Sequence, residues 1–115
     1  MHPFAVLADP VRRRIVELLA SGEQSSGQVV DKVGPEFEIT QSAVSQQLQT
    51  LREHGFARVR AEGRRRLYTL DPAPFMALDA WIAHYRAFWE GALDDLGEEI
   101  EASKAEHVKR KGLAN

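Results

Sequence analysis

The sequence predicts a mainly α-helical fold that carries one small β-hairpin, and three observations lead to this fold class. Apolar residues recur at steps of three and four through most of the 115 residues, which is the spacing of amphipathic helices. Between residues 57 and 70 the pattern changes to alternation on both sides of Glu62-Gly63, which is typical of a hairpin. From residue 72 to residue 103 the helical spacing returns and predicts a long final helix.

The first part of the chain predicts two helices in succession. Phe4 and Leu7 belong to a short apolar helix within residues 1–8. Asp9-Pro10 starts the second helix, because Asp is a favourable N-cap and Pro is tolerated at the first helical position. Gly22 is expected to end this helix.

Residues 26–54 predict two further helices joined by a turn. Ser25 and Gln28 have the spacing of a capping box, which marks the start of the first of them. Gly34-Pro35 is expected to stop that helix and to leave an extended connection behind it. Thr40 is the N-cap of the next helix, which we expect to reach residue 54.

Charge is distributed unevenly along the chain, although the net charge is only −2. Residues 41–66 hold six Lys or Arg and two Asp or Glu, a balance of +4, whereas residues 71–115 hold five and nine, a balance of −4. This asymmetry predicts a polyanionic partner for the middle of the chain and a different task for its end.

Several classes of function are excluded by what the sequence lacks. It has no cysteine, which excludes disulfides, thiolate metal sites and a cysteine nucleophile. It has no apolar run of membrane-spanning length and no signal peptide pattern, so we expect a cytoplasmic protein without a membrane partner. No phosphate-binding glycine loop or nucleophile elbow is present, and Ser45 and His54 are too far apart along one helix to form a dyad. We therefore expect no enzymatic activity and no cofactor.

The helix that follows Thr40 has one face suited to a DNA groove. Val44, Leu48 and Leu51 form the inward stripe, and the other face, up to Arg52, carries Ser and Gln without a carboxylate. Gln amides pair with adenine edges, Ser hydroxyls with either base type, and Arg with guanine or phosphate. An ordinary solvated helix face is the alternative interpretation. The neighbouring short helix and the basic hairpin favour DNA.

The hairpin concentrates positive charge at its tip. Adjacent arginines repel each other and do not stabilise the fold, so their expected use is contact with phosphates or insertion into a narrow minor groove. The alternative is a charged edge strand that prevents pairing with other chains. The five arginines of the hairpin are Arg58, Arg60, Arg64, Arg65 and Arg66.

Three runs of sequence resemble ArsR-type bacterial transcriptional regulators. Residues 7–19 read LADPVRRRIVELL and are similar to the opening of these proteins. Residues 40–48 read TQSAVSQQL and are similar to their recognition helix. Residues 51–56 and the EGRRRLY run at 62–68 are similar to their wing. The motifs span residues 4–72, and the long final helix fits by its position.

The resemblance implies a winged helix-turn-helix within a single domain over residues 1–115. It places dimerisation helices at 1–8 and 72–103, the helix-turn-helix at 26–54 and the wing at 57–70. It also implies a homodimer that represses its own operon by binding an inverted repeat in double-stranded DNA, with half-sites about 10 bp apart or a multiple of that. The DNA-binding residues that the helix face and the resemblance predict are Thr40, Gln41, Ser42, Ser45, Gln46, Gln49, Arg52, Arg64, Arg65 and Arg66.

Dimerisation is expected to use the first and last helices. The final helix is apolar on more than one side, so it should be covered on more than one side. Its aromatic residues at 81–89 could also line a pocket for a small organic effector between subunits, but packing is the preferred interpretation. The predicted dimer residues are Phe4, Leu7, Trp81, Ile82, Tyr85, Phe88, Trp89, Leu93 and Leu96.

No metal site is predicted, although many members of the resembled family sense metals. The stretch before the recognition helix, residues 27–33, has neither Cys nor His. On the last helix Asp79 and His84 lie five residues apart and are offset around the helix, so they do not have the spacing of a ligand pair. The four histidines are scattered along the chain: His2, His54, His84 and His107.

Two rival functions remain beside a sequence-specific repressor. A non-specific architectural DNA binder would share the basic hairpin but would not need the Gln and Ser face. A winged-helix module for protein interaction would not need the basic hairpin.

Three adjacent arginines lie in the second helix. We expect Arg12, Arg13 and Arg14 to solvate this helix, and a phosphate contact from one of them is the alternative.

Overall fold

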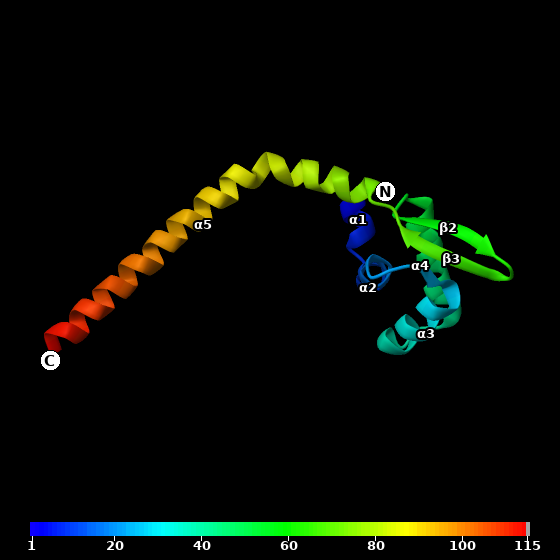
Figure 1. Ribbon diagram of the computed structural model, residues 1–115, viewed down its shortest axis with the longest axis horizontal. Helices are drawn as coiled ribbons and strands as arrows, with labels where there is room; N and C mark the ends of the chain where they lie inside the picture. The colour runs from blue at the N-terminus through cyan, green and yellow to red at the C-terminus, as the bar shows by residue number, and fades with distance from the viewer. Residues whose placement is uncertain (115) are drawn as a thin grey trace. The chain divides into compact units, whose positions relative to one another are not determined.

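The computed structural model describes the backbone of residues 1–114 and the side chains of residues 1–104. The chain divides into two compact units, Met1–Leu78 and a second unit from Asp79 onward. The first unit contains four helices, a three-stranded sheet and the first turns of a fifth helix (Figure 1). The elements are α1 (Pro3–Leu7), α2 (Pro10–Ala20), β1 (Gln24–Ser25), α3 (Ser26–Phe37), α4 (Gln41–Glu53), β2 (Ala57–Glu62), β3 (Arg65–Leu70) and α5 (Ala73–Ala114).

The three helix starts predicted from the sequence are confirmed. The Asp9 side chain accepts the backbone N–H groups of Val11 and Arg12 at 2.8 and 3.1 Å, and Pro10 occupies the first turn of α2. Ser25 and Gln28 form a reciprocal capping box at α3. The Thr40 hydroxyl caps α4. Each cap satisfies N–H groups that the helix itself leaves without partners.

The predicted end of the third helix is wrong. Gly34-Pro35 lies inside α3, which continues to Phe37 and ends at Glu38 in the left-handed conformation, with φ of 54°. A proline one turn before the end of a helix removes a single N–H donor, which the helix tolerates here. The backbone N–H groups of Glu38 and Ile39 close this turn on the Gly34 carbonyl. The connection to α4 is therefore short.

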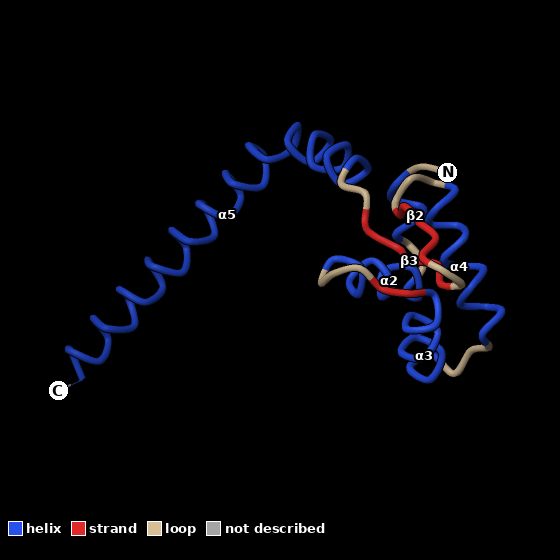
Figure 2. The backbone as a smooth tube through the Cα atoms, turned by 45° about the vertical axis from the view of Figure 1, so that its right-hand side comes forward, coloured by secondary structure: helices blue, strands red, loops and turns tan. Residues whose placement is uncertain are grey.

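The predicted hairpin is confirmed and belongs to a larger sheet. Strands β2 and β3 pair antiparallel around Gly63, whose φ of 60° suits glycine. Figure 2 labels the two hairpin strands β2 and β3. Strand β1 adds to the other edge of β3, with Gln24 opposite Tyr68, and gives the order β1-β3-β2. Strand β1 was not predicted, because two residues are too few to show an alternating pattern.

The core of the first unit lies between the helices and the sheet. Phe56 is its largest fully buried side chain and meets the ring of Phe75 edge to face at 5.4 Å. This contact and the burial of Leu78 attach the first turns of α5 to the unit. The remaining fully buried side chains are Val6, Ile15, Val29, Val33, Val44, Leu48 and Leu51.

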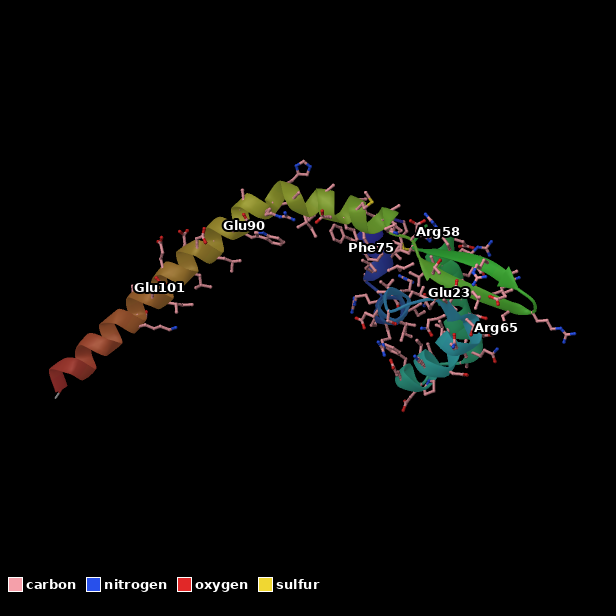
Figure 3. All side chains as sticks on the ribbon, viewed as in Figure 1. Glu23, Arg58, Arg65, Phe75, Glu90 and Glu101 are labelled. Carbon is pink, nitrogen blue, oxygen red and sulfur yellow. The ribbon has the colours of Figure 1, made fainter. Side chains whose placement is uncertain are left out.

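The second unit consists of α5 from Asp79 onward. The helix continues to Ala114, in agreement with the prediction of a helix to about residue 103 or beyond. Within residues 79–104 its side chains are mostly exposed, both the acidic ones, such as Glu90 and Glu101 (Figure 3), and the apolar ones. Among the described residues, no helix combines the length and the apolar character needed to cross a membrane.

Candidate nucleic-acid interface

Helix α4 buries one stripe and exposes the face predicted to enter a DNA groove. Val44, Leu48 and Leu51 are at most 1 % exposed and fix the rotation of the helix on the core. This confirms the predicted inward stripe. The opposite side therefore faces solvent, and the predicted DNA-binding residues on and beside α4 are all exposed: Thr40, Gln41, Ser42, Ser45, Gln46, Gln49 and Arg52.

Adjacent glutamines on α4 have different surroundings. Gln46 is exposed, and its side chain has no hydrogen-bond partner among residues 1–104. Gln47 is half-buried, and its Oε1 accepts a hydrogen bond from Arg12 Nη1 at 2.9 Å. Gln49 donates to the Glu53 carboxylate at 3.0 Å, so one carboxylate lies at the end of the polar face. Of these three glutamines, Gln46 is therefore the one whose side-chain amide is available to contact a ligand.

The arginines of α2 have structural contacts that the sequence analysis did not predict. Arg12 donates from Nε to the Val6 carbonyl at 2.7 Å, and Arg13 donates to the carbonyls of Leu7 and Ala8. Both guanidinium groups therefore cap the C-terminal end of α1, where carbonyls lack helical partners. The expectation that these two arginines merely solvate α2 is wrong.

Arg14 connects α2 to the end of α3. Its guanidinium makes two hydrogen bonds to the Glu36 carboxylate, at 2.8 and 3.1 Å, and also approaches Glu17 at 3.4 Å. The hydrogen bonds and the charge of Arg14 lower the pKa of Glu36. This pair holds the turn of α3 that contains Pro35 against α2.

The five arginines of the hairpin fall into two groups. Arg58 pairs with Asp71 at 2.8 Å, and Arg60 pairs with Glu23 at 2.8 Å, so both are neutralised within the fold. The hydrogen bond from Arg60 lowers the pKa of Glu23, and the nearby charge of Arg65 lowers it further (Figure 3).

The second group lies at the tip of the hairpin. Arg64, Arg65 and Arg66 are exposed, and none of their side chains has a hydrogen bond or ion pair within the described part of the chain. The structure therefore leaves available the three arginines that the sequence analysis assigned to DNA. The other two hairpin arginines, Arg58 and Arg60, were not among the predicted DNA-binding residues, and both form ion pairs within the fold.

A pocket of about 310 Å³ lies where α4, the start of α3 and strand β3 meet. We call it the junction pocket. It brings part of the predicted polar face together with one hairpin arginine. It also adds two residues, Ser26 and Tyr68, that were not predicted to contact DNA. The lining residues are Ser26, Ser45, Gln49, Arg52, Arg66 and Tyr68.

Metal-binding side chains do not gather in the described structure. Within residues 1–104 no group of three His, Asp or Glu side chains is arranged to hold an ion. The Asp79 carboxylate faces Arg86 at 3.5 Å. His107 lies outside the residues whose side chains are described.

Comparison with known proteins gives a consistent family assignment. Residues 7–60 match a family model described as a helix-turn-helix domain. The chain is 34% identical over 99 residues to the HTH-type transcriptional regulator Rv2034 of Mycobacterium tuberculosis, and the match covers 86% of each protein.

Solved structures show the same fold. The crystal structure of the ArsR family transcriptional regulator RHA00566 is 27% identical, with a TM-score of 0.66 over 77% of this chain and 88% of that one. A domain of Mb0332 from Mycobacterium bovis, described as a homodimeric winged helix-turn-helix DNA-binding domain, is 29% identical with a TM-score of 0.56. That match covers 73% of this chain and 77% of the other. With its sequence motifs, helix-turn-helix and three-stranded wing sheet, the chain belongs to the ArsR family of winged helix-turn-helix transcriptional regulators.

Proposed function

We propose that this regulator is a homodimeric repressor that binds an inverted-repeat operator in double-stranded DNA and controls its own operon. The observation that carries the proposal is the exposed face of α4, where the side chains of Gln41, Ser42 and Gln46 are oriented outward by the buried stripe beneath them. These groups both donate and accept hydrogen bonds, as reading of base edges in a major groove requires. A regulator of this kind in a bacterial cell works in the cytoplasm.

The hairpin supports the same orientation toward DNA. Arg64 and Arg65 are exposed at its tip and are not neutralised by an ion pair within residues 1–104. Their positive charge suits phosphates or a narrow minor groove beside the groove that α4 enters. We assign the hairpin to affinity and the α4 face to sequence discrimination.

A second copy of the chain is the proposed partner of α5. Trp81, Tyr85 and Trp89 are 45–51 % exposed, and Phe88 is 80 % exposed. A contiguous apolar surface of this kind on a monomer marks an interaction site. Ile82, Leu93 and Leu96 continue the surface along α5, and Phe4 and Leu7 on α1 are proposed as a separate contact with the second copy. The homodimeric relative from Mycobacterium bovis agrees with this assignment.

Hydroxyl-radical footprinting on DNA upstream of the protein's own gene tests the proposal. A two-fold repressor should protect two stretches about 10 bp apart, or a multiple of that, related by a symmetry axis. Gln46→Ala should weaken this pattern, whereas Arg58→Ala, which removes an arginine already paired with Asp71, should preserve it. Uniform protection of any duplex would instead indicate an architectural binder. No protection by the folded protein would favour a protein-interaction module.

A further inference from the structure

The junction pocket contains two guanidinium groups that have no partner among residues 1–104. Arg52 comes from the end of α4, and Arg66 comes from β3. Both side chains are exposed, and neither makes a hydrogen bond or ion pair with any residue among 1–104. Two cations that line one pocket repel each other, and an anion between them would convert that repulsion into attraction. The pocket is therefore suited to an anion.

Tyr68 supplies a hydroxyl to the same pocket. Its ring belongs to the core, since the residue is only 6 % exposed. The hydroxyl has no hydrogen-bond partner among the described residues, and these residues contain no buried side-chain oxygen or nitrogen that lacks a partner. The hydroxyl must consequently be open to the pocket that Tyr68 lines. A fixed ring with an open hydroxyl is a well-positioned donor.

The other lining groups also suit an anion. The hydroxyls of Ser26 and Ser45 are without partners in the described structure, and no carboxylate lines the pocket. Ser26 is the first residue of α3, where backbone N–H groups lack helical acceptors. One carboxylate adjoins a lining residue: Glu53 accepts a hydrogen bond from the Gln49 amide.

We propose that the junction pocket binds one backbone phosphate of the DNA and thereby fixes the hairpin strand β3 to helix α4 on the duplex. This inference rests on the proposed function, because the phosphate is that of the bound DNA. It assigns Tyr68 and Ser26 to the interface. It also makes Ser45, Gln49 and Arg52 positioning residues that contact the backbone, and leaves base reading to Gln41, Ser42 and Gln46.

Salt dependence tests whether the two arginines share one phosphate. The probe is a 24-bp duplex of shuffled sequence, whose binding is measured by fluorescence anisotropy over a KCl series. Each neutralised phosphate adds about 0.9 to the slope of log K against log salt. Because each subunit of the proposed dimer carries one pocket, the double variant Arg52→Ala/Arg66→Ala should lose about 1.8 from the slope of the native protein, about 0.9 for each of two phosphates. A loss near 3.6 would place the two arginines of each subunit on separate phosphates. An unchanged slope would remove both from the backbone, and either result overturns the proposal.

Lys104→Ala is the control for the loss of a positive charge outside the pocket. It removes one exposed positive charge from α5, outside the pocket. We expect its slope to equal that of the native protein. If Lys104→Ala flattened the slope as much as the double variant, the loss would reflect net charge and the pocket assignment would fail.

Tyr68→Phe tests the hydroxyl separately from charge. It keeps the buried ring and removes one donor to an anion, so affinity for the shuffled duplex should fall about tenfold. The salt slope should not change, because no charge is removed. Thr69→Val is the matched control, since it removes a hydroxyl from the next residue of β3, whose side chain points to the other face of the sheet. Equal affinity of Tyr68→Phe and the native protein would overturn the role of Tyr68.

The source of the phosphate is decided by competition. Inorganic phosphate and KCl at equal ionic strength should weaken duplex binding equally if the pocket is specific for the DNA backbone. Stronger inhibition by inorganic phosphate that disappears in Arg52→Ala/Arg66→Ala would assign the pocket to free phosphate and overturn the DNA assignment. Failure of the proposed function looks different, because the native protein itself would then bind no duplex.

Discussion

Arg12 on α2 donates a hydrogen bond to Gln47 on α4 at 2.9 Å, and the same guanidinium donates to the Val6 carbonyl of α1 at 2.7 Å. One side chain thus joins three helices, and it is only 14 % exposed. Gln47 is turned inward by this contact, while its neighbour Gln46 is exposed. The pair fixes how α4 presents its outer face.

Removal of Arg12 should therefore destabilise the protein. Arg12→Ala leaves the carbonyl of Val6 and the amide of Gln47 without their charged donor, and we expect a loss of about 2 kcal/mol in the free energy of unfolding. Gln47→Ala should cost about 1 kcal/mol, and the double variant should lose less than the two losses combined because they share one bond. Urea unfolding measures all three. Strictly additive losses would show that the Arg12–Gln47 bond contributes nothing.

Gln46 and Gln47 form a matched pair for testing base reading. Gln46→Ala removes an exposed amide and should reduce the ratio of operator to shuffled-duplex affinity by about tenfold, while its stability stays near that of the native protein. Gln47→Ala should lower stability and leave the ratio unchanged. Competition binding against both duplexes gives the ratio. An equal loss of affinity on both duplexes for Gln46→Ala would make Gln46 a backbone contact.

The arginines at the tip of the hairpin should determine much of the salt dependence. Arg64→Ala/Arg65→Ala should lower the slope of log K against log salt by about 0.9 for each phosphate contact that is lost. Arg58→Ala is the control, because its guanidinium is held by Asp71 at 2.8 Å. Anisotropy titrations over a KCl series provide the slopes. If the control flattened the slope as strongly as the double variant, the division of the hairpin arginines into two groups would be incorrect.

A charge within the apolar surface of α5 should separate the dimer. Trp89→Glu places a carboxylate that would be buried against the second copy, which is costly without a partner. We expect monomers in sedimentation velocity at micromolar concentration. Ala87→Glu introduces the same charge about 200° away around the helix and should leave a dimer. A surviving dimer in Trp89→Glu would move the interface elsewhere.

The Arg14–Glu36 pair should make stability depend on pH. Because pairing lowers the pKa of Glu36 in the folded protein, the pair stabilises the fold above the unfolded pKa of about 4.3, and this contribution is lost as the pH falls through the folded pKa. Glu36→Gln should therefore lower Tm at pH 7 and match the native protein near pH 2. Glu38→Gln, which removes a nearby exposed carboxylate, is the control. A Tm difference that persists at low pH would mean that Glu36 acts through packing.

Local signals in the sequence were sufficient to predict most of the elements. The side chains of Asp9, Ser25 and Thr40 cap helices as expected, because a capping oxygen and the N–H groups that donate to it lie within a few residues of each other. The alternating run after Gly55 likewise predicted β2 and β3. In contrast, the prediction that Gly34-Pro35 ends the third helix was wrong. The free-energy cost of a proline in a helix depends on how close it lies to the helix end, and the sequence did not show where α3 ends.

Contacts between distant segments could not be predicted in this way. Arg60 forms an ion pair with Glu23, and Arg14 forms one with Glu36. Tyr68 lines a pocket together with Ser26. Nothing in the sequence near an arginine indicates whether a carboxylate will meet it after folding. The sequence thus identified which side chains could contact DNA, and the structure distinguishes those that the fold already engages.

The most direct test of the account compares two duplexes over a salt series. Fluorescence anisotropy of the purified protein should show tight binding to the DNA upstream of its own gene and much weaker binding to a shuffled duplex, typically by a factor of at least 10³. The affinities for both duplexes should fall steeply as the salt concentration increases. Equal affinity for the two duplexes, or no binding to either by the folded protein, would contradict a sequence-specific repressor at its own operon.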